Sequence, residues 1–493
     1  MRTSVKALLL TALVAGLGIR LFFAWQLPFT NDEGAYLYDA KLLLEGTVAG
    51  GDVLSKSPVT AVLFTASVWL SQGSLFAGRW VAVIANILTA IPLAYLAWRI
   101  RGANAGIITA LLWLLLVPIP MTILGITQPI AALLAATCLA LWYAAPESRR
   151  HYTSLSLLAG LCFALAFMSR KTSLAVLLPT VYFWFIAQPQ PKKNTLLVSL
   201  AGLLIVVAPW LAILWRLYDL PGVMQALGIG YGDLLYESES AIAGQASIIR
   251  PLTVLTRTGS GLVLASVLGL GWASLKLRRK NLTPAMPLLW LLALVGLYIG
   301  WPVFLPEYLI DFFVPATLLA GLALAELWQH RARVTIATLL LIALASLLSY
   351  HSAFKIPWTG MFTKEAITQA AQELQTRVPI AEPIFTAAVI VPYVSGHNVM
   401  LDIAHPLWYT YESIPDQTKR AFLPPLPVVE SQLQDGPVRW ALVEHLTDYA
   451  YLRNESNLIS LFGQEWNLVA TLPNETGWRS NPLKLFARDN SDS

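Results

Sequence analysis

The sequence contains little charge and almost no cysteine. Only 12% of its 493 residues are charged, whereas a soluble domain has about 25%. Hydrophobic residues make up 56% of the chain, and the mean hydropathy is +0.61. Because a soluble core cannot bury this much apolar surface, the composition excludes a soluble globular protein and predicts an integral membrane protein.

Other scarcities exclude further classes of protein. The two cysteines, Cys138 and Cys162, lie in apolar runs, so they are interpreted as small buried hydrophobic residues and not as a disulfide framework or metal site. Basic patches with interleaved aromatic residues are lacking, so no nucleic acid partner is expected. The net charge of +5 is better explained by basic residues on cytoplasmic loops.

Long apolar runs are abundant. Segments of spanning length predict about eleven transmembrane helices, near residues 5–27, 79–98, 105–120, 129–145, 153–169, 172–187, 195–215, 254–275, 284–301, 308–328 and 334–351. A weaker apolar stretch, 58–71, is predicted to form a surface or re-entrant helix. The N-terminus is like a signal peptide, but its apolar run continues to Trp25 without a convincing cleavage site, so we interpret it as a retained span.

The charged residues indicate the orientation of the chain. One set of alternating loops is basic: Arg2, Lys6, Arg99, Arg101, Arg149, Arg150, Lys192, Lys193, Lys276, Arg278, Arg279, Lys280, Arg331 and Arg333. The opposite loops are acidic: Asp32, Glu33, Asp39, Glu45, Asp52, Asp233, Glu237 and Glu239. By the positive-inside rule the basic loops are cytoplasmic, so the acidic loops face outside a plasma or inner membrane.

The composition changes near residue 354, which divides the chain into a membrane domain, 1–353, and a soluble domain, 354–493. The segment "MFTKEAITQAAQELQTRV" has the period of a helix. The segments "PIFTAAVIV", "RWALVEH", "WNLVATL" and "PLKLFARD" are typical of strands, and "WNLVATL" is predicted to pair antiparallel with "PLKLFARD". An odd number of spans places this small α/β domain outside the cytoplasm.

The first outer loop, 28–78, begins with "PFTNDEGAYLYDAKLLLEG". Thr30-x-x-Glu33 matches a capping box, and Asp32 stands where a helix dipole favours an anion. One face of the predicted helix is formed by Tyr36, Leu37, Ala40, Leu43 and Leu44, with Tyr38 and Glu45 opposite. The pattern predicts a short amphipathic helix on the outer surface, in which the Asp-Glu pair has either a capping or a catalytic role.

Further ionisable residues are expected at the same outer face. They are Lys56 before Ser-Pro, Arg79 at the mouth of the second span, Arg170-Lys171 in a turn, and Glu307 with Tyr308 in "FLPEYL". Each has an ordinary explanation as a solvated residue, an interface anchor or a snorkelling cation. Adjacent cations on the side opposite the basic loops favour a bound anion such as a phosphate.

The ordered set "NDEGAYLYDAKLLLEG", "KSPV", "GRWVAVIANILTAIPLAYLAWRIRG" and "GLCFALAFMSRKTSLAVLLP" resembles the GT-C membrane glycosyltransferases. The branch most similar to it holds the protein O-mannosyltransferases and the lipid A aminoarabinose transferase. The resemblance extends from the first span to about residue 190, and more faintly through "PEYLIDFFVPATLLAGLAL". It implies a GT-C-like fold, a polyprenyl-phosphate sugar donor and an acceptor that is a lipid, glycan or protein.

The resemblance also implies roles for residues. Asp32, with Glu33 beside it, matches the catalytic carboxylate, and Lys56 matches a lysine that contacts the donor phosphate. Arg170 and Lys171 lie in a turn where the family typically has a lysine. Gln128 of "TQP" stands where the family usually has a second acid. Because glutamine is a poor metal ligand and no base, no metal cofactor is expected.

The mechanism implied is transfer on the outer face, with inversion at the anomeric carbon. Asp32 would be the general base, while Lys56, with Arg79, Arg170 or Lys171, would stabilise the leaving phosphate. Gln128, Tyr231, Glu307 and Tyr308 are expected to bind substrate. Loop 216–250, which contains Tyr231, is either a lid over the acceptor site or a solvated connection.

Two other functions remain open from the sequence. A transporter or flippase for lipid-linked or anionic substrates would also have charged residues on its spans, although no internal repeat is visible. A silent relative that only binds polyprenyl phosphate is compatible with Gln128. In the soluble domain His397, Asp402 and His405 suggest a metal site, but scattered histidines are more often structural.

Overall fold

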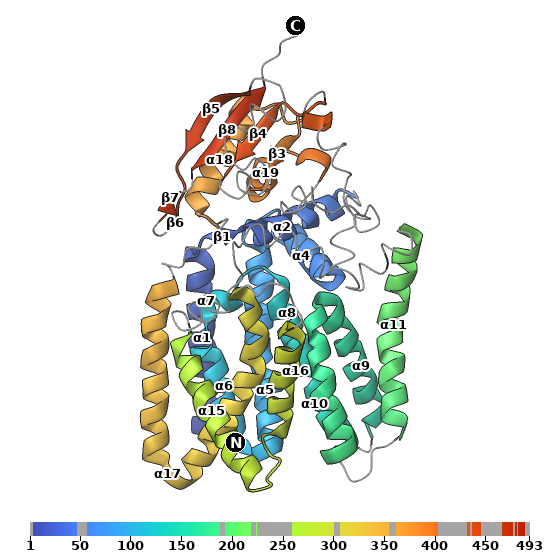
Figure 1. The fold of residues 1–493 in the computed structure, drawn as a ribbon, viewed down its shortest axis with the longest axis vertical. Coiled ribbons are helices and arrows are strands. Elements are labelled where there is room, and N and C mark those ends of the chain that lie inside the picture. Colours follow the sequence, from blue (N-terminus) through green and yellow to red (C-terminus); the bar gives the residue numbers. More distant parts are fainter. Residues whose placement is uncertain are drawn as a thin grey trace.

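The computed structural model shows a bundle of helices beneath a smaller domain that contains a sheet (Figure 1). It describes residues 3–46, 57–148, 150–187, 193–217, 223, 259–299, 306–353, 361–402, 431–433, 436–444, 466–476, 479–480 and 482–488. The helices of the bundle are coloured from blue to light orange in the figure, and the C-terminal domain from orange to red.

The bundle is that of a multi-pass membrane protein. In the described ranges, seven helices are long and apolar enough to cross a membrane. They are α1 (Thr3–Gln26), α5 (Ala77–Arg101), α8 (Thr127–Ala144), α9 (Tyr152–Ser169), α11 (Lys193–Leu217), α15 (Ser260–Arg278) and α17 (Leu309–Ala353). Two shorter apolar helices of the bundle are α6 (Ala103–Leu116) and α16 (Ala285–Ile299).

Within the described residues, each of the eleven apolar segments predicted from the sequence overlaps helical structure. The segments 308–328 and 334–351 are both part of α17, in which the chain turns at Arg331 (φ −149°) and reverses its direction (Figure 1). The segment 172–187 combines η2 (Lys171–Val176), α10 (Leu177–Tyr182) and the π-helix η3 (Phe183–Ala187). The number of membrane crossings, eleven, stays a prediction.

Helix α6 has 14 residues, about 21 Å at 1.5 Å per residue, so its C-terminus lies inside the bundle. Arg20 of α1 is fully buried there and donates to the carbonyls of Trp113 (3.0 Å) and Leu114 (2.6 Å) and to Asn86 Oδ1 (2.6 Å). The negative end of the helix dipole favours this cation.

Two residues of α17 complete the cap. Tyr350 donates its hydroxyl to the carbonyls of Leu115 and Val117, and Ser346 donates to that of Leu116. The carbonyls at a helix end have no hydrogen-bond donor within the helix. These side chains donate the hydrogen bonds that the last carbonyls of α6 lack. The cap thereby fixes the segment that follows, α7 (Ile119–Thr122) and the start of α8.

Helices α2 (Asn31–Leu44) and α4 (Pro58–Leu70) lie across the top of the bundle, under the C-terminal domain (Figure 1). Helix α4, the weaker apolar stretch of the sequence, has 13 residues. Phe64 of α4 is fully buried in an apolar cluster with Leu37 of α2 and Ile130 of α8. The two helices therefore form a layer between the bundle and the domain.

The C-terminal domain contains a four-stranded sheet of order β3-β4-β8-β5. Its strands are β3 (Ile384–Thr386), β4 (Trp440–Val443), β5 (Trp466–Leu472) and β8 (Leu483–Arg488). A separate two-stranded sheet pairs β6 (Glu475–Thr476) antiparallel with β7 (Arg479–Ser480). The predicted antiparallel pairing of "WNLVATL" with "PLKLFARD" is confirmed, because these segments form β5 and β8. Strands β3 and β4 are parallel. The predicted helix is α18 (Lys364–Arg377).

One strand prediction was too long. The segment "PIFTAAVIV" forms β3 only as far as Thr386, whose hydroxyl accepts from the amide of Ala388, and α19 (Ile390–Ser395) follows. The side chain bonds to the backbone two residues on, which favours a turn over further extension of the strand.

A two-stranded antiparallel sheet joins the two parts of the chain. Strand β1 (Phe29–Thr30), directly before α2, pairs with β2 (Met361–Phe362). Phe29 and Phe362 are buried in one apolar cluster with Phe76. The start of the segment 28–78 is therefore attached to the C-terminal domain.

Candidate active site

The capping box predicted at the start of α2 is confirmed. The hydroxyl of Thr30 accepts from the amide of Glu33 (3.2 Å), and a carboxylate oxygen of Glu33 accepts from the amide of Thr30 (3.0 Å). Asp32 lies in the first turn and is half-buried. The box fixes the direction in which α2 leaves the bundle.

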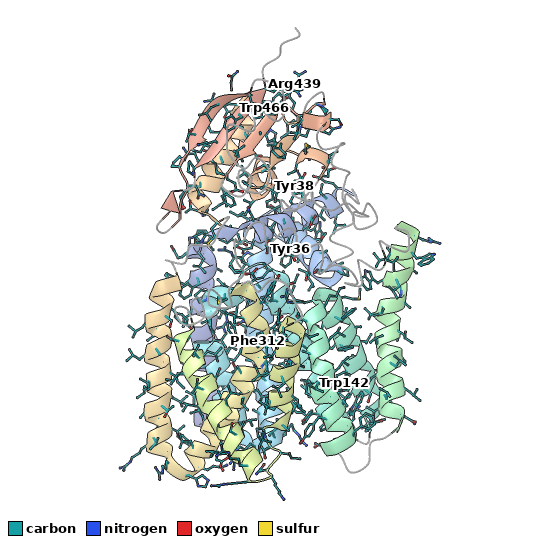
Figure 2. The ribbon with its side chains drawn as sticks, in the orientation of Figure 1. Tyr36, Tyr38, Trp142, Phe312, Arg439 and Trp466 are labelled. Carbon is teal, nitrogen blue, oxygen red and sulfur yellow. The ribbon has the colours of Figure 1, made fainter. Side chains whose placement is uncertain are left out.

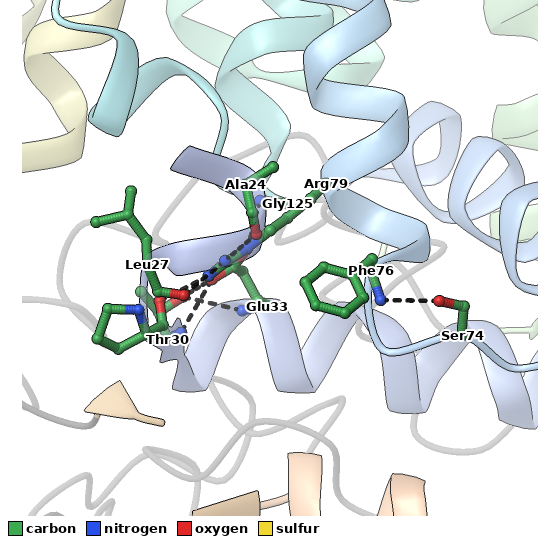
Figure 3. Close-up of polar contacts among 9 residues, drawn as sticks. Ala24, Leu27, Thr30, Glu33, Ser74, Phe76, Arg79 and Gly125 are labelled. Atoms are coloured by element: carbon green, nitrogen blue, oxygen red, sulfur yellow. Dashed lines mark hydrogen bonds and ion pairs between the residues drawn. The ribbon is translucent and has the colours of Figure 1, made fainter. Parts of the chain in front are cut away.

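Glu33 and Arg79 form a buried, bidentate ion pair (Figure 3). Arg79 Nε and Nη2 donate to the two Glu33 carboxylate oxygens at 2.7 and 2.9 Å. The other N–H groups of Arg79 donate to the carbonyls of Ala24 (2.7 Å), Leu27 (2.7 Å) and Pro28 (2.6 Å). A guanidinium has five N–H donors, and all five of Arg79 are used.

The carboxylate oxygens of Glu33 also have a full set of hydrogen-bond donors. Besides Arg79 and the Thr30 amide, the carboxylate accepts from the amide of Gly125 at 2.9 Å. This geometry assigns Glu33 and Arg79 a structural role, because neither has hydrogen-bonding capacity left for a substrate. We therefore do not retain the predictions that Glu33 assists catalysis and that Arg79 binds the donor phosphate.

Helix α2 has three faces with different surroundings. The prediction that it has one apolar face and an opposite polar face is therefore wrong. Glu33, Leu37 and Ala40 lie on one face and are buried. Tyr38, expected on the polar face, is fully buried. The face of Asp32 and Tyr36 is only partly covered, and Figure 2 marks Tyr36 and Tyr38 between the bundle and the C-terminal domain.

Arg170 belongs to a polar cluster at the end of α9. Its Nε donates to Asp311 Oδ2 at 2.9 Å and its Nη2 to the Tyr298 hydroxyl at 3.0 Å. Asp311 Oδ2 also accepts from the hydroxyls of Thr172 (2.7 Å) and Tyr298 (2.5 Å). The ring of Tyr308 lies 4.7 Å from the guanidinium carbon of Arg170, so two residues predicted for the site are in contact.

Sequence reasoning missed Asp311, Tyr298 and Thr172. A signal was present for Asp311, which is an acidic residue in the first turn of a long apolar helix, where ionisable groups are costly and usually functional. The two hydroxyls have no distinguishing pattern in the sequence.

Lys171 has a different environment from its neighbour. Its ammonium is buried and has no hydrogen-bond partner among the described residues, and it lies 4.7 Å from the ring centre of Phe167 and 4.9 Å from that of Trp210. It begins η2, outside the candidate spans, and burial lowers its pKa to about 8. A buried cation that lies over aromatic rings and has no hydrogen-bond partner in the described ranges is well suited to an anionic ligand.

The start of α4 reaches the same turn. The hydroxyl of Ser57 donates to the carbonyl of Ser169, the residue before Arg170. Ser57 follows Lys56 in the sequence, but Lys56 lies outside the described residues, as do Tyr231, most of loop 216–250, and His405.

Gln128 is buried at the N-terminus of α8, where its Oε1 accepts from the hydroxyl of Thr127 at 3.0 Å. The Gly125 amide, three residues earlier, is the group bonded to Glu33. The hydrogen bond attaches the loop before Gln128 to α2. Glu307 and Tyr308 lie in η4 (Pro306–Tyr308), which leads into α17.

The suggested metal site in the C-terminal domain is not supported. The ring nitrogens of His397 are bonded to Ser395 Oγ (2.9 Å) and the Val378 carbonyl (3.1 Å), and Asp402 lies beside the Tyr38 hydroxyl. Within the described ranges no group of three or more histidine, cysteine or acidic side chains could hold a metal ion. That no metal takes part in the reaction stays a prediction.

Comparison with known proteins identifies the fold. The family model for dolichyl-phosphate-mannose-protein mannosyltransferase matches residues 55–213. The Cupriavidus metallidurans ArnT bound to undecaprenyl phosphate is similar over 98% of this chain and 98% of its own, with a TM-score of 0.59 at 12% identity. The chain has the GT-C fold.

Further GT-C structures agree. The Archaeoglobus fulgidus oligosaccharyltransferase in complex with Zn and sulfate has a TM-score of 0.60 at 11% identity, over 95% of this chain and 73% of that one. The archaeal oligosaccharyltransferase AglB with an inhibitory peptide and a dolichol-phosphate has 0.54 at 13% identity, over 99% and 74%. No curated protein matches the sequence. At such identities the likeness establishes the fold, and the expected resemblance is confirmed at that level.

Proposed function

We propose that this GT-C chain is a glycosyltransferase that moves a sugar from a polyprenyl-phosphate donor to a lipid, glycan or protein acceptor on the outer face of the membrane. The observation that carries the proposal is the buried ammonium of Lys171, which has no hydrogen-bond partner in the described part of the chain and lies in the turn that Ser57 contacts through the carbonyl of Ser169. The mannosyltransferase family model and a similar structure bound to undecaprenyl phosphate support a lipid-phosphate donor.

The reaction is a direct displacement. An acceptor oxygen or nitrogen attacks the anomeric carbon as the bond from that carbon to the phosphate oxygen breaks. Asp32 takes the acceptor proton, a contribution of about 10²–10⁴-fold. Polyprenyl phosphate leaves as an anion, stabilised by Lys171 and by Lys56, and the anomeric configuration inverts because there is one displacement.

The two cations of the turn have different parts in this proposal. The charge of Arg170 is balanced by Asp311, and its contacts with Tyr298 and Tyr308 orient those rings. Lys171 has no carboxylate at hydrogen-bond distance in the described part of the chain. Lys171 is thus the phosphate ligand, and Arg170 shapes the wall beside it.

Substituting Lys171 by methionine is expected to weaken donor binding by about 10- to 100-fold, since a hydrogen bond to a charged group contributes about 1.5–3 kcal/mol and tenfold in affinity is about 1.4 kcal/mol. Binding of a polyprenyl-phosphate sugar to protein in nanodiscs measures it. Lys364→Met is the matched control, because Lys364 also lies over aromatic rings, Trp25 and Phe76, but on α18. Equal affinity of Lys171→Met and wild type would contradict the assignment.

Donor binding is also expected to depend on pH. Desolvation lowers the pKa of Lys171 to about 8, so its ammonium is charged below that pH and loses its proton as the pH rises through it. The phosphodiester of the donor does not titrate in this range. Affinity should therefore decline above pH 8 in the wild type and stay level in Lys171→Arg, whose guanidinium keeps its charge. A decline of the same size in both proteins would refute this explanation.

The proposal requires α2 and the C-terminal domain to face outside. In a background without Cys138 and Cys162, a cysteine replacing the exposed Thr368 of α18 should react with a membrane-impermeant maleimide in intact cells. A cysteine replacing Arg333, which is exposed and follows the turn of α17 at Arg331, should react only after permeabilisation. The reverse pattern would place the site on the cytoplasmic side.

A further inference from the structure

The C-terminal domain holds one whole face of α2, the helix that carries Asp32. This face consists of Gly34, Tyr38 and Lys41, which follow one another at helical spacing. A second face of the same helix is held in the bundle, where Glu33 binds Arg79 and the amide of Gly125. Helix α2 is therefore clamped between the two parts of the chain (Figure 1).

At Gly34 the clamp is a backbone contact. A Cβ atom added to this glycine would lie 2.7 Å from Ile390 Cβ and 3.0 Å from Ile390 N. Only glycine lets α19 approach this closely, which explains a residue that is otherwise unfavourable inside a helix.

At Tyr38 and Lys41 the clamp is polar. The fully buried Tyr38 hydroxyl accepts from the amide of Val399 at 2.7 Å and lies 3.5 Å from Asp402 Oδ1. Burial raises the pKa of Tyr38, so the hydroxyl stays protonated. One turn on, Lys41 Nζ donates to the carbonyls of Gly396 and His397, both at 3.3 Å.

We infer that Tyr38 and Lys41 are positioning residues for the transfer reaction, through which the C-terminal domain fixes the rotation of α2 and hence the direction of Asp32. This inference rests on the proposed function. Asp32 lies on the third face of the helix, so a rotation about the helix axis displaces its carboxylate sideways. Displacements of this kind are costly, because a base must be held within hydrogen-bond reach of the proton it removes.

The first test measures the clamp without chemistry, by hydrogen exchange of the α2 amides in the full chain. Tyr38→Phe, which keeps the ring, and Lys41→Met are expected to speed exchange at residues 31–44 and leave α5 unchanged. Gly34→Ala should do the same, although alanine is the better helix former. Unchanged exchange of α2 in all three variants would overturn the inference, whether or not any donor is turned over.

The second test measures transfer. Tyr38→Phe and Lys41→Met should lower the rate at saturating donor about tenfold, which equals about 1.4 kcal/mol, while the donor affinity set by Lys171 stays within about twofold. Lys41→Arg should restore the rate, because its guanidinium can donate to the same carbonyls. Arg377→Gln is the control, since it removes an exposed ion pair with Glu373 within α18.

The outcomes separate the inference from the function on which it rests. Wild-type rates in Tyr38→Phe and Lys41→Met would overturn the inference and leave the transferase intact. A wild type that releases no sugar, with faster exchange of α2 in the variants, would refute the proposed function and retain the clamp.

Discussion

Replacing Arg79 with methionine is expected to destabilise the protein by about 3–5 kcal/mol, the usual cost of removing one partner of a buried ion pair. The change leaves the Glu33 carboxylate buried with its charge unbalanced. It also removes the donors from the carbonyls of Ala24, Leu27 and Pro28, which end the first span. Chemical unfolding in detergent micelles measures the difference.

Two comparisons make this test specific. Arg377→Gln breaks an exposed ion pair, which is expected to cost about 0–1 kcal/mol. Lys cannot form the five bonds of Arg79, so Arg79→Lys should recover only part of the loss. An Arg79→Met protein as stable as the wild type, with weaker donor binding, would contradict the structural role and return Arg79 to the phosphate site.

Replacing Asp32 with asparagine is expected to lower transfer by about 10²–10⁴-fold, the usual contribution of a general base. Asparagine has the shape of aspartate and also favours the start of a helix, but it cannot take the acceptor proton. Stability and donor affinity should therefore stay close to wild type. The measurements are the transfer rate at saturating donor and the affinity for the donor.

The adjacent Glu33→Gln is the matched control. Glu33 is 2% exposed and bonded to Arg79 and Gly125, so its neutral variant should lose stability in a way that Asp32→Asn does not. If Asp32→Asn and Glu33→Gln lost the same stability and activity, both carboxylates would be structural and the catalytic assignment of Asp32 would fail.

The features predicted correctly from the sequence are local ones. The capping box follows from two residues three positions apart, and the apolar runs follow from hydropathy alone. The period of "KEAITQAAQELQTR" predicted α18, and the alternation near the end of the chain predicted the pairing of β5 with β8. None of these depends on a distant partner.

The misjudged features depend on contacts between distant residues. Arg79 was expected to bind phosphate because its charge is visible in the sequence, but its partners lie 46 to 55 positions away. Tyr38 was expected on a polar face, because nothing in α2 shows that residues 390–402 cover it. Lys171 was recognised as a cation, but only the fold shows that Asp311 pairs with Arg170 and that no described residue forms a hydrogen bond with the ammonium of Lys171.

The measurement that tests the central claim most directly is the release of polyprenyl phosphate from a panel of radiolabelled polyprenyl-phosphate sugars in membranes. It compares wild type, Asp32→Asn and Lys171→Met. The account predicts release by the wild type from at least one donor, little release by Asp32→Asn although it still binds that donor, and weak binding by Lys171→Met. Donor that is bound by the wild type but never cleaved would contradict it, and would favour a transporter or a silent lipid-binding relative.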